Sequence, residues 1–167
     1  MLFYLQTPGM GVEIALLTRN IKIEGKFIAG VTTQYQGGYL QIFHTPGVPQ
    51  VIEGVEFNYM GQYDQKNRHP IQLLYTGDVA GTSISRNSIR RTNNGCIWLD
   101  GVSGVTVSSN VAHDSLRNDC YYIGYEATSN VIVGNLASYV RSHDAFDIKS
   151  PENDFIRNVA AGTYGRG

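Results

Sequence analysis

Four short segments of this chain share one pattern: ISRNSI at residues 84–89, VSSNVA at 107–112, IVGNLA at 132–137 and FIRNVA at 155–160. An apolar residue stands three positions before each asparagine, and another follows two positions after it. The asparagines are separated by 23, 25 and 23 residues and are Asn87, Asn110, Asn135 and Asn158. A period of this length, with β-branched alternation and no helical stripe, is typical of one coil of a parallel β-helix.

Stacked coils lie about 4.8 Å apart, so equivalent asparagines are expected to bond to those above and below them in an inward ladder. A leucine-rich repeat also stacks asparagines, but these segments lack its regularly spaced leucines. The sequence therefore predicts an all-β fold, a right-handed parallel β-helix of about six coils between Asn20 and Asn158. Weaker copies of the pattern place Val55 before Asn58 and Leu17 before Asn20, and the period fails from Phe27 to Pro49.

Residues 1–167 are interpreted as a single β-helix domain. Neither end carries an obvious polar cap for its unpaired strand edges. We therefore expect a piece of a longer chain, with the remainder of that chain as a partner at both ends of the helix.

A second repeat predicts which side chains face outward. Two apolar columns keep the coil period: Ile71, Ile97, Tyr121 and Phe146, and two residues later Leu73, Leu99, Ile123 and Ile148. Because side chains alternate across a strand, the neighbouring columns must point out of the helix. These outward columns are Gln72, Trp98, Tyr122 and Asp147, followed by Leu74, Asp100, Gly124 and Lys149.

Aromatic rings among carboxylates and amides are what sugar binding requires. Gln72, Trp98, Tyr122, Asp147 and Lys149 are therefore candidate substrate-binding residues. The alternative is that a loop or a neighbouring domain covers the aromatic rings.

Two further pairs fall one coil apart at the turn before this strand. Asp119 and Asp144 are candidates for acid–base work or for holding calcium, or else they bond to backbone N–H groups as turn aspartates commonly do. Cys96 and Cys120 are close enough for either a disulfide or a pair of stacked thiols. No third ligand stands at zinc-site spacing, so zinc is not expected.

The composition excludes several function classes. The net charge is −1, charged residues make up 16% of the chain, and no basic stripe suits nucleic acid. No apolar run is long enough to span a membrane, and the first residues lack the pattern of a signal peptide.

Several segments, taken in order, resemble one family: ALLTRNIKIEG (15–25), IEGVEFNYMGQ (52–62), NRHPIQLLYTGD (67–78), NNGCIWLDGVSGVTVSSNVAHDS (93–115) and DFIRNVAAGTYG (154–165). They are similar to the β-helix of the fibrocystin-L and cell-surface hyaluronidase family. The resemblance implies an extracellular or cell-surface location and a carbohydrate-handling role. It matches Arg68, Asp78, Cys96 and Cys120.

The departures from that family concern the outward columns. Hyaluronan-cleaving members carry two histidines where this chain has Gln72 and Leu74, and further histidines where it has Asp100 and Asp119. They also place an acidic pair near Gly124 and Tyr125. These departures indicate a degenerate catalytic face.

Three functions remain open. The first is an extracellular module that binds a carbohydrate polymer or a protein partner without cleaving it. The second is a polysaccharide-cleaving enzyme that uses Arg68, Asp78 and Asp100, with Asp119 or Asp144 assisting. The third is a structural spacer. No cofactor is expected for any of them, apart from calcium at Asp119 and Asp144.

Overall fold

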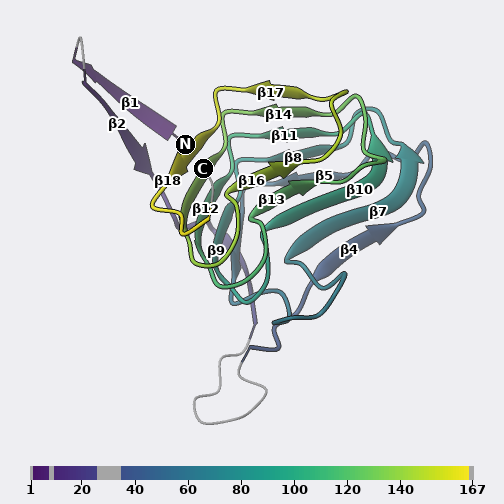
Figure 1. The fold of residues 1–167 in the computed structure, drawn as a ribbon, viewed down its shortest axis with the longest axis horizontal. Coiled ribbons are helices and arrows are strands. Elements are labelled where there is room, and N and C mark those ends of the chain that lie inside the picture. Colours follow the sequence, from purple (N-terminus) through teal and green to yellow (C-terminus); the bar gives the residue numbers. More distant parts are fainter. Residues whose placement is uncertain (1, 8–9, 26–34, 166–167) are drawn as a thin grey trace.

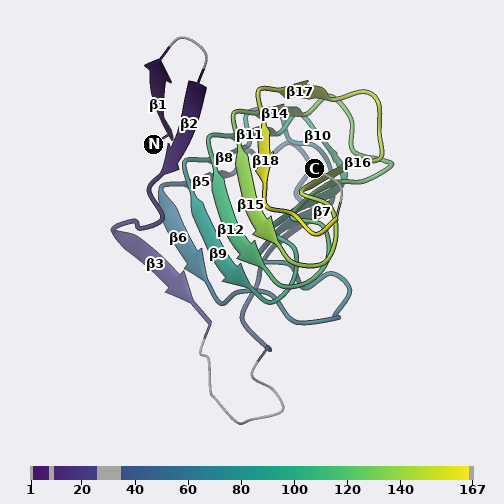
Figure 2. The same cartoon turned by 60° about the vertical axis from the view of Figure 1, so that its left-hand side comes forward.

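A computed structural model describes residues 2–7, 10–25 and 35–165. All the named secondary-structure elements within these ranges are β-strands. The strands form three parallel sheets that wind around a common core (Figures 1 and 2). The prediction of an all-β, parallel β-helix is confirmed.

Sheet 1 contains β4 (Leu40–Phe43), β7 (Ile71–Asp78), β10 (Ile97–Ser103), β13 (Tyr121–Ile123) and β16 (Phe146–Ile148). Sheet 2 contains β5 (Val51–Glu53), β8 (Ser83–Ser85), β11 (Thr106–Ser108), β14 (Val131–Val133) and β17 (Asp154–Ile156). Sheet 3 contains β3 (Ile21–Glu24), β6 (Val55–Asn58), β9 (Ser88–Thr92), β12 (Val111–Ser115), β15 (Leu136–Val140) and β18 (Val159–Ala161).

One strand from each sheet makes a coil. Coil 1 runs through β4–β6, coil 2 through β7–β9, coil 3 through β10–β12, coil 4 through β13–β15 and coil 5 through β16–β18. The strand β3 adds part of a further turn beneath coil 1. A separate antiparallel hairpin, β1 (Leu2–Thr7) and β2 (Met10–Ala15), projects away from the stack (Figure 2).

The core is a column of apolar side chains between the sheets. Ile71, Leu73, Leu99 and Ile132 are each fully buried there, and the inward columns predicted for sheet 1 pair in register from coil to coil. Alternation along each strand explains this, since every second side chain of a parallel coil must point inward.

The predicted asparagine ladder lies at the turn between sheets 2 and 3. Asn87 donates from Nδ2 to Oδ1 of Asn110 (3.1 Å), Asn110 to Asn135 (3.0 Å) and Asn135 to Asn158 (3.0 Å). Each of these asparagines also donates to a backbone carbonyl of the coil beneath, such as that of Ile84 below Asn110 (2.8 Å). The ladder is confirmed, and its amides satisfy buried backbone groups that water cannot reach.

The weaker copies of the pattern were placed in the wrong register. The N–H group of Val55, not a side chain of Asn58, meets Oδ1 of Asn87 (3.0 Å), and Asn58 pairs with Arg90. Asn20 lies just before β3 and is exposed. The stretch predicted to break the period also contributes a regular strand, β4, although its residues 26–34 lie outside the described ranges.

Candidate functional site

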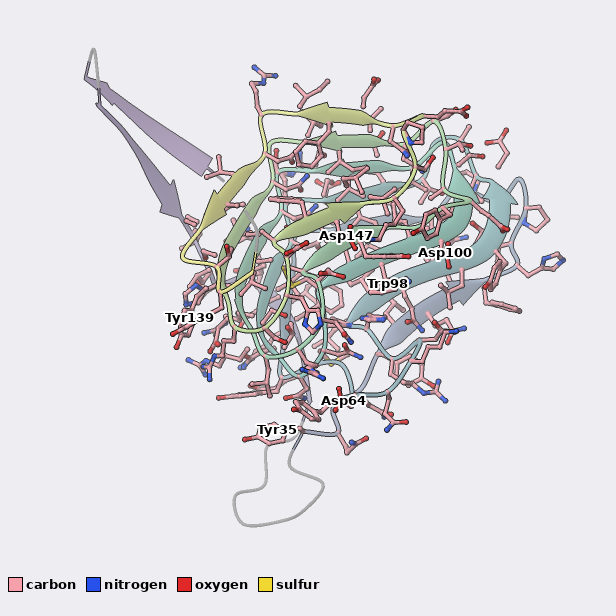
Figure 3. The ribbon with its side chains drawn as sticks, in the orientation of Figure 1. Tyr35, Asp64, Trp98, Asp100, Tyr139 and Asp147 are labelled. Carbon is pink, nitrogen blue, oxygen red and sulfur yellow. A yellow bond between two sulfur atoms is a disulfide. The ribbon has the colours of Figure 1, made fainter. Side chains whose placement is uncertain are left out.

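The outward face of sheet 1 carries the predicted columns in register. Trp98 pairs with Gln72 on one side and Tyr122 on the other, and Tyr122 pairs with Asp147. In the next column Asp100 pairs with Leu74. Figure 3 labels Trp98, Asp100 and Asp147 on this face.

Three aromatic rings are stacked on one another along this face. The imidazole of His69 lies 4.0 Å from the indole of Trp98 between ring centroids, at an interplanar angle of 11°. The ring of Tyr122 covers the opposite face of the indole at 3.7 Å and 15°. A sugar ring therefore cannot stack on a face of Trp98 while His69 and Tyr122 stay in place, and the ring edges are what remain for contact.

Gln72 and Leu74, the two positions where active relatives are expected to hold histidines, are covered. Their exposed fractions are 0% and 2%. The amide of Gln72 is occupied, since Nε2 donates to Oε1 of Gln41 (3.0 Å) and to the carbonyl of Asn67 (2.8 Å), while Oε1 accepts from the N–H group of His69 (3.2 Å). Gln72 thus holds the preceding loop against the sheet and has no free group to offer a ligand.

The charged half of the face lies on coils 3 to 5. Asp147 forms an ion pair with Lys149 (2.7 Å). The carboxyl group of Asp100 lies over Gly124, where any added Cβ would collide with it. Burial and the nearby Glu126 raise the pKa of Asp100 above its usual range.

Tyr122 lies between these two acidic groups. Burial raises the pKa of its phenol, and the negative charges of Asp100 and Asp147 raise it further. The hydroxyl therefore stays protonated and is available as a hydrogen-bond donor.

His69 is a functional candidate that the repeat pattern does not reveal. Burial lowers the pKa of its imidazole to about 3, so the ring is neutral at physiological pH. Its Nδ1 is buried without a hydrogen-bond partner among the described residues. Its position beside Pro70, directly before β7, was the available signal, but the repeat pattern assigns no column to it.

The three catalytic candidates are not brought together. Arg68 lies before β7 with its guanidinium 4.4 Å from the ring centroid of Tyr39. Asp78 is the last residue of β7 and accepts a hydrogen bond from the N–H group of Ala80 (3.0 Å). Asp100 pairs with the middle of β7, so the three side chains follow the strand rather than converge on one point.

The two turn aspartates, Asp119 and Asp144, are joined by one hydrogen bond between a side chain and the backbone. Oδ1 of Asp119 accepts from the N–H group of Asp144 (3.0 Å), which is the capping role left open by the sequence. Burial raises the pKa of the Asp119 carboxyl group. Within the described ranges no group of three or more His, Cys, Asp or Glu side chains is placed to hold a metal ion.

Cys96 and Cys120 lie on adjacent coils, as predicted, with their Cα atoms 4.5 Å apart. Of the two arrangements that the sequence left open, the structure contains the disulfide. The bridge lies directly before β10 and β13 and so fixes the start of the two strands that carry Trp98 and Tyr122.

Comparison with known proteins places the chain in one family. A family model described as CEMIP beta-helix matches residues 35–147. Communication mutant protein F of Dictyostelium discoideum is 33% identical over 132 residues, covering 78% of this chain and 11% of that protein. A cell surface hyaluronidase of Danio rerio is 28% identical over 150 residues, covering 79% of this chain and 11% of that protein.

The cell surface hyaluronidase CEMIP2 of Homo sapiens is 26% identical over 130 residues, covering 68% of this chain and 9% of that protein. The chain thus spans about a tenth of the length of these curated relatives. No solved structure matches it. None of the described residues forms a helix that could cross a membrane. With the family model covering most of the coils and the disulfide, the chain belongs to the CEMIP β-helix family.

Proposed function

We propose that this chain is an extracellular β-helix module that binds a carbohydrate polymer through the outward face of sheet 1 without cleaving it. The observation that carries the proposal is the state of the acid–base groups on that face. The carboxyl group of Asp100 has a raised pKa, the carboxylate of Asp147 is ion-paired, and the imidazole of His69 is buried and neutral. The names of the cell surface hyaluronidases among the relatives support a carbohydrate as the ligand class.

The binding chemistry comes from coils 3 to 5. The carboxyl group of Asp100, the hydroxyl of Tyr122, and the charged pair of Asp147 and Lys149 lie in neighbouring columns. Together they offer donors and acceptors for sugar hydroxyls, while the exposed edges of the aromatic stack supply apolar contact. A polymer lying across the coils would meet these groups in succession.

Cleavage of a glycosidic bond needs a proton donor and a second group that acts as nucleophile or base. Asp100 suits the first role, but Asp147 lies two coils away, roughly 10 Å by the spacing of parallel strands. That separation exceeds the ~6.5–9.5 Å of inverting enzymes and the ~5–5.5 Å of retaining enzymes. Lys149 also neutralises Asp147, and neutral His69 has no proton to donate as an imidazolium ion.

A hydrolase is the second candidate, favoured by one observation. The raised pKa of Asp100 is what a general acid requires near neutral pH. In that case Arg68 and Asp78 would have to act from the two ends of β7, and a polymer would have to be long enough to reach both.

The deciding experiment incubates the protein with labelled hyaluronan at neutral pH, with and without calcium, and follows polymer length by size-exclusion chromatography. We expect retained polymer length, and binding in a parallel glycan array. A time-dependent fall in length that Asp100→Asn abolishes would establish the hydrolase instead. An increase of binding on adding calcium that is lost in Asp119→Asn would assign Asp119 and Asp144 to a calcium site.

Surface variants test the binding face. Lys149→Gln and Tyr122→Phe each remove one polar contact and should weaken glycan binding severalfold, whereas exposed Asp154 on sheet 2 serves as the control position for Asp154→Asn. Trp98→Ala removes the ring beneath Tyr122 and should weaken binding further. If no glycan binds and no polymer is shortened, the module binds a protein partner or is a spacer.

A further inference from the structure

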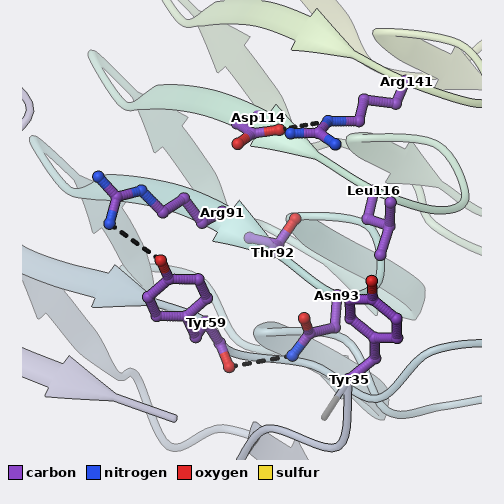
Figure 4. Close-up of a pocket in the computed structure, with 8 residues that line it drawn as sticks. All are labelled: Tyr35, Tyr59, Arg91, Thr92, Asn93, Asp114, Leu116 and Arg141. Carbon is purple, nitrogen blue, oxygen red and sulfur yellow. Dashed lines mark hydrogen bonds and ion pairs between the residues drawn. The ribbon is translucent and has the colours of Figure 1, made fainter. Parts of the chain in front are cut away.

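A pocket of about 290 Å³ lies at the ends of the sheet 3 strands, beside the turns that lead from sheet 3 to sheet 1. Its walls come from sheet 3 and the turn that follows it, and the residues that matter for its chemistry are Tyr35, Tyr59, Arg91, Asp114, Leu116 and Arg141 (Figure 4). None of these residues belongs to sheet 1, so the pocket is separate from the proposed polymer-binding face.

The backbone turns three of these side chains into the pocket at one repeated position. Tyr59, Arg91 and Asp114 occupy equivalent places on coils 1, 2 and 3, and their φ angles are 54°, 50° and 66°. In sheet 3 this position interrupts the regular pairing of neighbouring strands. A left-handed conformation is uncommon for residues with large side chains, and its recurrence here aims an aromatic ring, a cation and a carboxylate at one opening.

The charges in the pocket do not cancel. Nε of Arg141 donates to Oδ1 of Asp114 (2.6 Å), which neutralises that carboxylate. Arg91 has no carboxylate partner among the described residues: its Nη1 donates to the hydroxyl of Tyr59 (3.1 Å), and its guanidinium carbon lies 5.4 Å from the centroid of that ring. The pocket is therefore left with one net positive charge, and the remaining N–H donors of the Arg91 guanidinium have no acceptor among the described residues.

The rest of the lining is aromatic and apolar. Figure 4 shows the ring of Tyr35 and the side chain of Leu116 on one side of the opening, and Tyr59 with Arg91 on the other. Tyr35 remains 38% exposed, so its ring is accessible to a ligand. Aromatic faces take the C–H side of a sugar, and a guanidinium fork takes a planar oxyanion through paired hydrogen bonds.

We propose that this pocket binds a single sugar ring that carries an oxyanion, either a carboxylate or a sulfate. The oxyanion pairs with Arg91, the ring rests between Tyr35 and Tyr59, and hydroxyl groups reach Asp114 or the tyrosine hydroxyls. The volume of about 290 Å³ lies just below the ~300–1,000 Å³ of typical ligand pockets, which suits a ligand of one sugar unit. This site does not depend on the sheet 1 face, and either proposal can fail without the other.

The experiment uses three defined oligosaccharides of equal length: one with glucuronate units, the same one with its carboxyl groups reduced to alcohols, and one bearing sulfates. Binding is measured by titration calorimetry and by saturation-transfer NMR. We expect the neutral oligosaccharide to bind at least about tenfold more weakly than one of the anionic ones, with the anionic affinity falling as salt is added. The comparison of the two anionic arms identifies carboxylate or sulfate as the preferred oxyanion.

Variants locate the binding to this pocket. Arg91→Gln should reduce the anionic affinity about tenfold or more, and Arg91→Lys should restore part of it, because a lysine keeps the charge but not the fork. Arg157→Gln is the matched control, since Arg157 is also an exposed arginine with a left-handed backbone (φ 48°) but lies outside the pocket. Equal binding of the neutral oligosaccharide would overturn the proposal. So would an anionic affinity that is unchanged in folded Arg91→Gln and Arg91→Lys proteins, or one that is lost only in Lys149→Gln.

Discussion

His69 gives the protein a specific dependence on pH. Its pKa in the folded state is about 3, below the ~6.5 of an exposed histidine, so the unfolded chain binds more protons between these values. The stability associated with neutral His69 is complete above pH ~6.5 and is lost as the pH falls. The expected slope from this group is about 1.4 kcal/mol of unfolding free energy per pH unit between pH 6 and pH 4.

The variant His69→Phe removes the titration but keeps a ring against Trp98. The Nδ1 atom of His69 has no hydrogen-bond partner among the described residues, so the substitution removes little polar contact. Urea unfolding at pH 4, 5, 6 and 7 should show a flatter profile for the variant than for the native protein. Parallel profiles would mean that His69 is solvated and that the ring stack opens in solution.

Asp100 makes the stability of the protein depend on pH in the opposite direction. Because its pKa is raised in the folded state, folding favours the protonated form, and the stability from this group is present at low pH and lost as the pH rises through the raised value. Asp100→Asn keeps an acceptor for the N–H group of Gly101 and removes the charge. Thermal unfolding should therefore show a melting temperature a few degrees higher for the variant at pH 7, with a smaller gain at pH 4.

A lower melting temperature at pH 7 would contradict this reading of Asp100. Asp154→Asn, at an exposed position on sheet 2, is the matched control and should change the melting temperature little at either pH.

For single residues, the sequence predicts which way a side chain points but not which groups pack against it. Alternation along β10 shows that Trp98 and Asp100 point out of the helix, and that is where they lie. What covers them depends on the loop before β7, whose path is set by the bonds of Gln72 to Asn67 and His69. No repeat describes that loop, so the buried imidazole and the closed faces of the indole could not be derived from a period.

At the scale of single elements, the asparagines contribute unequally to the stability of the protein, depending on whether they belong to the buried ladder. Asn110 is buried and bonds to Asn87, Asn135 and the carbonyl of Ile84. Asn110→Leu would leave these buried groups unpaired and should cost about 2–5 kcal/mol of unfolding free energy. Asn20→Leu, at an exposed position before β3, should cost less than about 0.5 kcal/mol.

Chemical unfolding of the two variants, followed by circular dichroism, measures the difference. Equal losses of stability would show that the ladder amides have access to water.

The ladder also shows what a repeat pattern can and cannot reveal. Its strong copies were found because the apolar residues around each asparagine repeat too. A second, shorter ladder, Asn130 donating to Asn153 (2.9 Å) at the turn between sheets 1 and 2, was missed. Each of its members lies five residues before a member of the first ladder, so the signal was present, but only two copies exist to carry it. In coil 1 the ladder position holds Val55, and a nearby asparagine therefore gave the wrong register.

At the scale of the whole molecule, burial falls toward the last coil. Ile132 and Phe155 pair in register in one inward column of sheet 2, yet their exposed fractions are 0% and 46%. Ile132→Ala should therefore cost about 2–5 kcal/mol, and Phe155→Ala clearly less, although phenylalanine is the larger side chain. Equilibrium unfolding in guanidinium checks the order, and a larger loss at Phe155 would mean that another surface covers coil 5 in solution.

The disulfide between Cys96 and Cys120 has a mechanical consequence for the stack. In a solenoid each coil bonds only to its neighbours, so a force applied to the two ends should peel coils away one at a time. Hydrogen bonds yield to such a force, but a covalent bond between coils 3 and 4 does not. The residues between the two cysteines, which are separated by 24 positions, stay out of the stretched chain. Pulled in a force spectrometer, the oxidised protein should extend roughly 80 Å less than the reduced protein when fully unfolded.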